Sequence, residues 1–260
     1  MTIKTVSATR YVTPLREGGS LPAVVEADDG ETYVMKFTGA GQGTRALVAE
    51  IIAGEIGRAL GLRVPELAFV LLDPALGPSE PNAEISDLLR ASVGLNLGLR
   101  FLPGALAYSP LLKPAPAANL ASSIVWFDAY VTNVDRTVRN TNILIWQGEL
   151  WLIDQGAALY FHHDWRDYLA RSLTPFPFIK NHVLLPLATA LEEADAAARD
   201  RLTPQRLEAI VDLVPEAWLD GGPFATAAET RGAYLAFLTS RLAASAAFVD
   251  EANHARTLLV

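Results

Sequence analysis

Two short polar segments, each set against apolar sequence, mark the middle of this chain. The first begins at Asp135 and carries Asn140 five residues later; the second begins at Asp154, directly after the apolar residues 150–153. An Asp that orients or deprotonates a hydroxyl, and an Asn and an Asp that hold Mg²⁺, are what phosphoryl transfer from ATP requires. Each segment alone also suits an ordinary turn, because Asp and Asn bond to nearby backbone. Their order and spacing together predict a kinase-type phosphotransferase site.

The elements around these segments would aim the carboxylates. Apolar residues recur at helical spacing over residues 120–134, which predicts a helix leading into the first segment. Residues 143–146 and 150–153 resemble two short strands joined by a hairpin turn at Gly148. Asp154 would then leave the end of a buried strand, two residues before a glycine that permits sharp backbone geometry.

Other polar residues nearby have more than one interpretation. Arg136 either contacts phosphate or braces the loop, and Asn142 adds a metal or structural hydrogen bond or is simply a turn residue. Asp128, seven residues before the first carboxylate, would share a helix face with it and brace the loop. Adjacent His162 and His163 point in different directions in a strand and lack a third ligand cluster, so structural or surface roles are expected.

Composition excludes several classes of protein. Of 260 residues 51% are hydrophobic and 19% charged, so the chain is globular, and the net charge of −8 argues against nucleic-acid binding. Without cysteine there are no disulfides, thiol nucleophiles or Cys-ligated zinc. The first ten residues lack the apolar part of a signal peptide, and no run approaches the ~18 apolar residues of a membrane span. We therefore expect a cytoplasmic protein with no membrane association, and the many Ala and Leu with few Lys suggest a bacterial source.

Patterning changes along the chain. The earlier part is strand-rich, with strands predicted over residues 5–12, 23–27, 31–37, 67–72 and 97–102 and helices over residues 44–60 and 83–91. The later part is mainly helical, with helices over residues 120–134, 204–213 and 227–249, the last capped by Thr226 with Glu229. This predicts an α+β, bilobal kinase-like fold, with a β-rich N-lobe over 1–102 and a helical C-lobe over 103–260.

A cation for the nucleotide phosphates is expected on the third strand. Lys36 would lie on the same strand face as Val34, which needs an anionic partner if that face is buried, or else the Lys extends to solvent from an edge strand. Glu50 and Glu55 of the following helix point about 140° apart. Glu55 can pair with Arg58, whereas Glu50 lies among small and apolar residues, so Glu50 is the predicted partner of Lys36.

A glycine-containing loop between the first two strands lies where kinases cover the phosphates. Gly18, Gly19 and Ser20 would let backbone N–H groups approach phosphate oxygens, although the same residues also suit an ordinary flexible turn. Ser20 is in addition a candidate autophosphorylation site.

These segments together resemble the HipA-like kinase family, bacterial relatives of the Ser/Thr kinase HipA and distant cousins of the phosphatidylinositol kinases. The resemblance is carried by four stretches, residues 33–36, 50–65 (ending LGLRVP), 133–140 and 152–156. It implies a bilobal fold with ATP in the cleft. It also assigns Lys36 to phosphate binding, Asp135 to catalysis, and Asn140 and Asp154 to Mg²⁺.

The same resemblance places residues 99–102 between the lobes, with the backbone of Arg100, Phe101 and Leu102 available to adenine. The predicted activity is transfer of the γ-phosphate of ATP to a hydroxyl, most simply a Ser or Thr of an unidentified protein. A small-molecule kinase using the same site, a nucleotide-binding pseudokinase that regulates a partner, and a non-enzymatic interaction domain remain alternatives.

Overall fold

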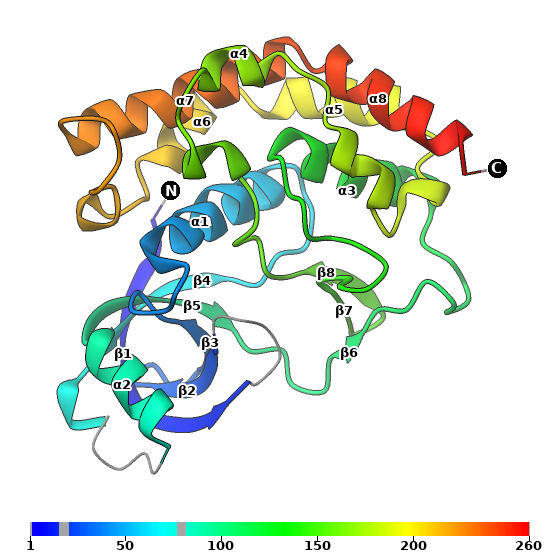
Figure 1. Cartoon of the computed structure of the whole chain (residues 1–260). Coiled ribbons are helices and arrows are strands. Elements are labelled where there is room, and N and C mark those ends of the chain that lie inside the picture. The colour runs from blue at the N-terminus through cyan, green and yellow to red at the C-terminus, as the bar shows by residue number, and fades with distance from the viewer. Residues whose placement is uncertain (1, 16–20, 77–81, 260) are drawn as a thin grey trace. The chain divides into compact units, whose positions relative to one another are not determined.

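The computed structural model describes residues 2–15, 21–76 and 82–259. It contains both helices and sheets, as the predicted α+β class requires, and it divides into two compact units (Figure 1). Unit 1 comprises Met1–Leu47 and Pro65–Gly104, and unit 2 comprises Val48–Val64 and Ala105–Val260. The predicted lobes, residues 1–102 and 103–260, stay a prediction about folding domains; by contacts, residues 48–64 go with the second unit.

Unit 1 is built on a closed five-stranded barrel with strand order β1-β2-β3-β5-β4. The strands are β1 (Lys4–Pro14), β2 (Ala23–Ala27), β3 (Thr32–Lys36), β4 (Leu67–Leu72) and β5 (Gly94–Arg100). Neighbours are antiparallel except β1 and β4, whose parallel pairing closes the barrel. The sequence predicted β2 and β4 with the observed bounds, because their apolar runs end at clear turn signals. The strand predicted over residues 97–102 begins earlier, at Gly94, and ends at Arg100.

Alternation along the strands fills the barrel. Tyr33 and Met35 of β3 are buried, and Val34 and Lys36 on the opposite face are half-buried. Gly98 of β5 lies where a Cβ would come within 2.6 Å of Val70 Cγ2 and 3.2 Å of Tyr33 Cβ, so only glycine fits there. Helix α2 (Ala83–Ala91) completes this core with its buried apolar side chains.

A buried amide ties the end of β3 to the start of β5. Asn96 Oδ1 accepts from the Thr38 backbone N–H at 3.0 Å, and Asn96 Nδ2 donates to the carbonyls of Ser92 at 2.7 Å and Gly94 at 3.1 Å. A buried polar group lowers the stability of a protein unless it is hydrogen-bonded. The side-chain amide of Asn96 has partners for both its oxygen and its nitrogen, and it therefore holds the chain in place just beyond Lys36.

Helix α1 (Gly43–Ala59) begins and ends one residue before the predicted bounds, and Gly61, with a left-handed φ of 83°, follows its C-terminus. Its C-terminal part belongs to unit 2. A Cβ on Gly57 would lie 3.5 Å from the ring of Phe127, and Arg201 donates a hydrogen bond to the Leu60 carbonyl. Just past the helix, the Leu152 N–H donates to the Arg63 carbonyl at 2.8 Å.

Unit 2 combines a small sheet with helices. The sheet has the order β6-β7-β8, formed by β6 (Leu106–Ala107), β7 (Ile143–Trp146) and β8 (Glu149–Leu152). The predicted hairpin is confirmed: Gln147 and Gly148 both have positive φ, as a tight two-residue turn requires. The helices are α3 (Ala118–Tyr130), α4 (Tyr168–Ser172), α5 (Leu191–Arg201), α6 (Pro204–Val211), α7 (Ala227–Ala243) and α8 (Ala246–Thr257).

Two helix predictions were wrong in extent. The helix predicted over residues 120–134 ends at Tyr130, because Thr132 has a left-handed backbone with φ 53°. The helix predicted over residues 227–249 is two helices, α7 and α8, bent by 60° at the break. The predicted Thr226–Glu229 capping box of α7 is present. In the described part of the chain no single helix meets the length and apolarity of a membrane span, and only this bent pair does so together.

A buried arginine closes the C-terminal end of α3. Arg241 of α7 donates to the carbonyls of Ala129 at 2.8 Å and Tyr130 at 3.0 Å, and also to those of Ser172 and Thr174. The last carbonyls of a helix lack partners within it, so this guanidinium supplies them. Burial lowers the pKa of Arg241 to about 10, which leaves it charged at neutral pH. Arg241 thereby fixes the point from which the chain enters the polar loop after α3.

Candidate active site

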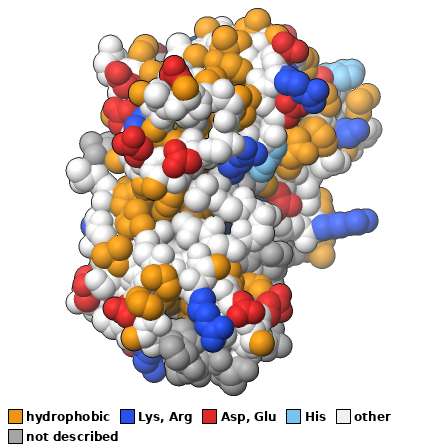
Figure 2. Space-filling view, turned by 60° about the vertical axis from the view of Figure 1, so that its left-hand side comes forward, with side chains coloured by type: hydrophobic (Ala, Val, Ile, Leu, Met, Phe, Trp, Pro, Cys, Tyr) orange, Lys and Arg blue, Asp and Glu red, His pale blue; other side chains and the backbone are white. Residues whose placement is uncertain are grey.

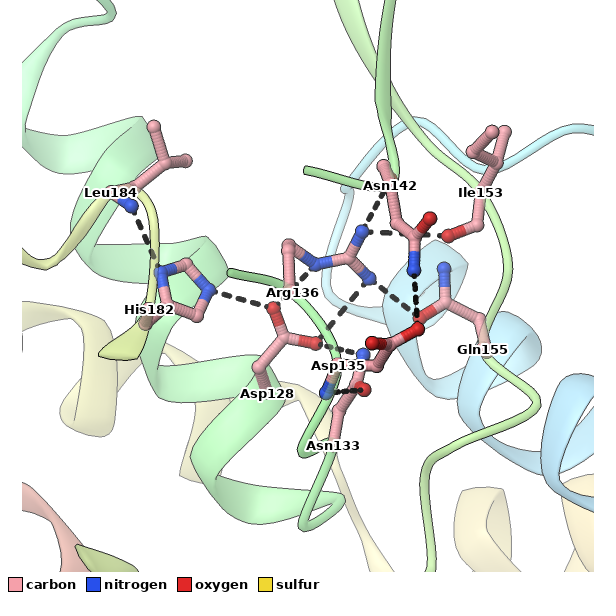
Figure 3. A network of polar contacts seen from close by, with 9 residues as sticks. All are labelled: Asp128, Asn133, Asp135, Arg136, Asn142, Ile153, Gln155, His182 and Leu184. Atoms are coloured by element: carbon pink, nitrogen blue, oxygen red, sulfur yellow. Dashed lines mark hydrogen bonds and ion pairs between the residues drawn. The ribbon is translucent and has the colours of Figure 1, made fainter. Parts of the chain in front are cut away.

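The loop between α3 and β7 brings its carboxylate and amides together. Asp135 is half-buried, and its Oδ2 accepts from Asn140 Nδ2 at 2.7 Å and from Asn142 Nδ2 at 3.2 Å (Figure 3 draws the second bond). The Asp135 N–H in turn donates to Asn133 Oδ1 at 3.1 Å. The predicted grouping of Asp135 with Asn140 is therefore present, and Asn142 does more than make a turn because it bonds the same oxygen.

These bonds also determine which way the Asn140 amide points. A carboxylate only accepts, so the atom facing Asp135 is the NH₂ group and the carbonyl Oδ1 faces away from it. Asn140 is exposed, which leaves this oxygen accessible to a ligand from solvent.

Asp154 has an unusual backbone. It follows β8 with a left-handed φ of 54°, a conformation that Asp and Asn tolerate better than other non-glycine residues. The sharp geometry expected at Gly156 is thus adopted by Asp154 itself, and Gly156 is not among the residues with positive φ. Just before it, the Ile153 N–H donates to the Asn142 carbonyl at 3.0 Å, which ties this turn to the Asp135 loop.

The two carboxylates repel each other. Burial raises the pKa of Asp135 above its ordinary value, and the negative charge of Asp154 raises it further. Hydrogen bonds from Asn142 and Asn140 and the charge of Arg136 act in the opposite direction. A divalent cation would relieve this repulsion, and two carboxylates with an amide oxygen are the hard ligands that Mg²⁺ prefers. The residues present therefore fit such an ion.

A buried network lies behind the Asp135 loop (Figure 3). Arg136, 1% exposed, donates from Nε to Asp128 Oδ2 at 2.6 Å and from Nη2 to Gln155 Oε1 at 2.7 Å. Its Nη1 bonds the Asn142 carbonyl. One guanidinium therefore connects α3, the start of β7 and the residue after Asp154. Of the two interpretations of Arg136, the structure supports bracing, because the side chain is buried among protein acceptors.

Asp128 anchors this network from α3. Asp128 Oδ1 accepts from Asn133 Nδ2 at 2.9 Å, and Oδ2 lies 2.8 Å from His182 Nε2. Burial would raise the pKa of Asp128, but the charge of Arg136 and the His182 contact outweigh it and hold that pKa below its ordinary value. The predicted shared helix face with Asp135 was wrong because α3 ends at Tyr130. Asp128 reaches the loop through Arg136 instead.

His182 and Gln155 were not predicted as parts of the site, yet both bond to it. His182 is 54 residues from Asp128, and Thr137 forms an isolated antiparallel bridge with it. The Val183 N–H also donates to the Arg136 carbonyl at 3.1 Å. Only the fold reveals these contacts, since no local pattern relates such distant positions.

The histidine pair shows no sign of a metal site. His162 is fully buried in unit 2, and its Nδ1 lies 2.9 Å from the Tyr234 hydroxyl. Within the residues that the structure describes, no group of three or more His, Asp or Glu side chains could hold a metal ion.

The predicted nucleotide-binding residues lie in separate parts of the chain. Lys36 is half-buried at the end of β3, opposite Leu97 of β5, in unit 1. Glu50 is fully buried in α1 and belongs to unit 2, so its pairing with Lys36 stays a prediction. Gly18, Gly19 and Ser20 lie outside the described residues.

The segment predicted to contact adenine is partly engaged in unit 1. The Arg100 N–H donates to the Glu66 carbonyl and the Phe101 N–H to the Thr32 carbonyl, both at 2.8 Å. Of the three predicted N–H groups, that of Leu102 is the one these bonds do not use.

Unit 2 carries a carboxylate–amide loop followed by a second carboxylate, the arrangement that the sequence predicted for a protein of the kinase class. The sequence profile of the HipA-like kinases matches residues 9–242, and the chain therefore belongs to this family of kinases, as its motifs predicted. No curated protein sequence matches it.

One solved structure shows a similar fold. The proinflammatory kinase CtkA of Helicobacter pylori superposes with a TM-score of 0.51 at 15% identity, covering 100% of both chains. Two structures of the Golgi casein kinase are more distant. One, with Mn/ADP bound, has a TM-score of 0.47 at 13% identity, and the other 0.46 at 14%; both cover 96% of this chain and 73% and 72% of theirs.

Proposed function

We propose that this kinase transfers the γ-phosphoryl group of ATP, with Mg²⁺, to a Ser or Thr hydroxyl of a protein. The observation that carries the proposal is the convergence at Asp135, whose Oδ2 lies 2.7 Å from Asn140 Nδ2 and whose pKa responds to the charge of Asp154. The side-chain types that phosphoryl transfer requires, two Asp and one Asn, are thus near one another, although they come from two segments.

Asp135 is the carboxylate that orients the acceptor hydroxyl and accepts its proton. Asn140 and Asn142 hold its Oδ2, which fixes the carboxylate and leaves Oδ1 to receive the hydroxyl hydrogen. Its raised pKa makes it a stronger proton acceptor than an ordinary Asp, provided that it is ionised at the working pH.

Asn140 and Asp154 would hold the metal. Mg²⁺ bound there supplies the positive charge that stabilises the phosphate oxygens during transfer. Within the protein, the Arg136–Gln155 bond at 2.7 Å holds the residue next to Asp154 and so orients that carboxylate.

ATP would be recognised by the residues that the sequence assigns to the phosphates and to adenine. Lys36, with Glu50 as its predicted partner, is the cation assigned to the phosphates, and residues 18–20, predicted to cover them, lie outside the described residues. Adenine would receive a hydrogen bond from the Leu102 N–H, since those of Arg100 and Phe101 are used within the barrel unit.

The decisive experiment compares the wild type with Asp135→Asn after incubation with ATP and Mg²⁺ and an acceptor peptide. Asn keeps an acceptor for the Asn140 bond but cannot take a proton, so turnover should fall by about 10²–10⁴-fold. Intact-mass measurement of protein and peptide records the transfer.

ATP binding provides the control. With ATP near one hundred times its dissociation constant, both proteins should gain about 2.7 kcal/mol of stability. Equal phosphate transfer by wild type and variant would refute the role of Asp135. Stabilisation of the wild type without transfer to any acceptor would indicate a pseudokinase, and the absence of stabilisation would exclude the ATP site.

A further inference from the structure

Most exposed Lys and Arg side chains in the described part of this acidic protein have a bonding partner. On the face shown in Figure 2, Lys and Arg side chains stand apart from one another among Asp and Glu. Ten exposed Lys and Arg side chains in the described residues have a carboxylate or carbonyl partner: Lys4, Arg10, Arg58, Arg63, Arg90, Arg100, Arg166, Arg199, Arg201 and Arg206.

Three exposed cations differ. Within the ranges 2–15, 21–76 and 82–259, Lys113, Arg139 and Lys180 are the exposed Lys and Arg side chains with no ion pair or hydrogen bond. They are far apart in sequence, yet each stands on a segment connected to the loop that carries Asp135.

The backbone contacts establish these connections. Arg139 lies in the loop itself, four residues after Asp135. Lys180 comes two residues before His182, which forms a bridge with Thr137 of the same loop. Two residues span at most about 7 Å of chain, so Lys180 is held beside the loop.

Lys113 lies on a segment that bonds to the C-terminal end of the same loop. The Tyr108 N–H donates to the Ile143 carbonyl at 2.9 Å, and Thr141 Oγ1 donates to the Tyr108 carbonyl at 3.3 Å. Lys113 follows Tyr108 by five residues, or at most about 18 Å of chain.

Exposed apolar side chains accompany the cations. Val138, next to Arg139, is 65% exposed, and Phe178, two residues before Lys180, is 55% exposed. A β-branched residue and an aromatic ring left in water beside unpaired cations form a mixed surface of the kind that binds another protein segment.

We propose that the acceptor of this kinase is an acidic protein segment, held beside Asp135 by Arg139, Lys180 and Lys113 and contacted by Val138 and Phe178. This rests on the proposed function, because it names the substrate class of the same site. Because the protein has a net charge of −8, its surface repels an acidic segment on average, and unpaired cations provide a place where such a segment is attracted.

Binding tests the proposal without relying on catalysis. The probe is a fluorescein-labelled 12-residue peptide with one Ser flanked by Glu, and its partners are the same peptide with Gln or Lys flanks. Fluorescence anisotropy with the full chain should show the Glu peptide binding more tightly than the Gln peptide. This preference should fall between 50 mM and 300 mM salt, because exposed charges are screened.

Charge removal identifies the residues. In Arg139→Ala and Lys180→Ala, the dissociation constant for the Glu peptide should rise about two- to five-fold each, the range of an exposed ion pair. Lys113→Ala should act in the same direction. Arg206→Ala, which removes an exposed guanidinium of α6 that already donates to the Arg201 carbonyl, is the matched control and should change nothing.

Kinetics distinguish the acceptor from ATP. The three variants should raise the KM for the Glu peptide and leave the KM for ATP unchanged. A raised KM for ATP instead would mean that the cations serve the triphosphate, and would overturn the proposal. Equal binding of Glu, Gln and Lys peptides would overturn it as well.

Failure of the proposed function has a separate signature. If the chain binds the Glu peptide through Arg139 and Lys180 but transfers no phosphate, the surface stands and the activity is wrong. If it phosphorylates a Lys-flanked peptide best, the activity stands and the acidic acceptor is wrong.

Discussion

At the scale of single residues, Arg136 connects several segments of the site through its hydrogen bonds. It bonds Asp128, Gln155 and the Asn142 carbonyl while almost completely buried. A planar guanidinium has five donors in a fixed geometry, whereas a Lys ammonium has three on a flexible stem. The position therefore depends on shape as well as on charge.

Removing this guanidinium leaves Asp128 buried without its cation. Arg136→Met should cost about 3–5 kcal/mol of unfolding free energy, the usual result of breaking one side of a buried ion pair. Arg136→Lys keeps the charge and should lose less. Urea titration at pH 7 measures both, and a loss below about 1 kcal/mol in Arg136→Met would contradict the bracing role.

The ion pair of Asp128 with Arg136 also predicts that the free energy of unfolding falls at low pH. Because the pKa of Asp128 is held below its ordinary value, its contribution is complete above about pH 3.9, the unfolded Asp value, and is lost as pH falls through the lower folded value. In Arg136→Met, Asp128 loses the cation that holds its pKa down, so unfolding should begin at higher pH. Urea midpoints between pH 2.5 and 6 for both proteins test this, and superimposable curves would exclude it.

Replacing Asp154 should change the stability in the opposite direction from replacing Arg136. Its charge raises the pKa of Asp135, so ionising Asp135 at neutral pH costs folded-state stability. Asp154→Asn removes the repulsion and tolerates the left-handed φ of 54°, so it should stabilise the protein at pH 7. The gain should vanish at pH 3, where carboxyls are protonated, and phosphoryl transfer should be lost. A less stable variant at pH 7 would count against the repulsion.

Residue types and local spacing were enough to find Asp135, Asn140 and Asp154, because these lie within 20 positions of one another around one hairpin. His182 and Gln155 could not be found in this way. Their partners are fixed by tertiary contacts, and neither residue belongs to a local pattern that requires it. The orientation of Asp154 was also beyond the sequence, since nothing distinguishes a left-handed Asp from the glycine two positions on.

At the scale of elements, turn signals placed the ends of β2 and β4 better than periodicity placed the ends of α3 and α7. Strand bounds are set by turn residues such as Asp29 and Gly30. Helical periodicity, by contrast, continues across the 60° bend between α7 and α8, because both helices bury apolar side chains on either side of it. Barrel closure was not predicted, since it depends on the parallel pairing of β1 with β4, about 60 residues apart.

Two glycines in regular elements should respond oppositely to alanine. Gly98→Ala places a Cβ 2.6 Å from Val70 Cγ2 inside the barrel and should destabilise by about 1–3 kcal/mol through overpacking. Gly232→Ala in the exposed face of α7 meets nothing within 4 Å and should stabilise by about 0.5–1 kcal/mol. Thermal unfolding of the two variants beside the wild type decides, and shifts of the same sign would show that the barrel accommodates the methyl group.

At the scale of the whole molecule, the grouping of residues 48–64 with unit 2 has a practical result. A fragment of residues 103–260 follows the division suggested by the sequence but lacks the part of α1 that contacts Phe127 and the Arg63 carbonyl that receives the Leu152 N–H. It also loses fully buried Ile51, Ile52 and Ile56, each worth about 1.5–3 kcal/mol of burial.

We expect this fragment not to fold cooperatively by itself, because those losses approach the entire stability of a typical domain, about 5–15 kcal/mol. Adding a peptide of residues 43–64 should restore a cooperative transition. Circular dichroism and urea titration, with and without the peptide, give the answer. A fragment that unfolds cooperatively alone would show that α1 is dispensable to unit 2.

The closed barrel of unit 1 also determines how other chains can associate with this protein. A closed ring of strands has no open edge, so a neighbouring polypeptide cannot extend it by backbone hydrogen bonding. The small sheet of unit 2 ends at β6, two residues long, and at β8, four residues long. Edges this short are poor templates for growth into fibrils, so concentrated solutions of the folded protein should resist ordered aggregation, and association through unit 1 must rely on side chains.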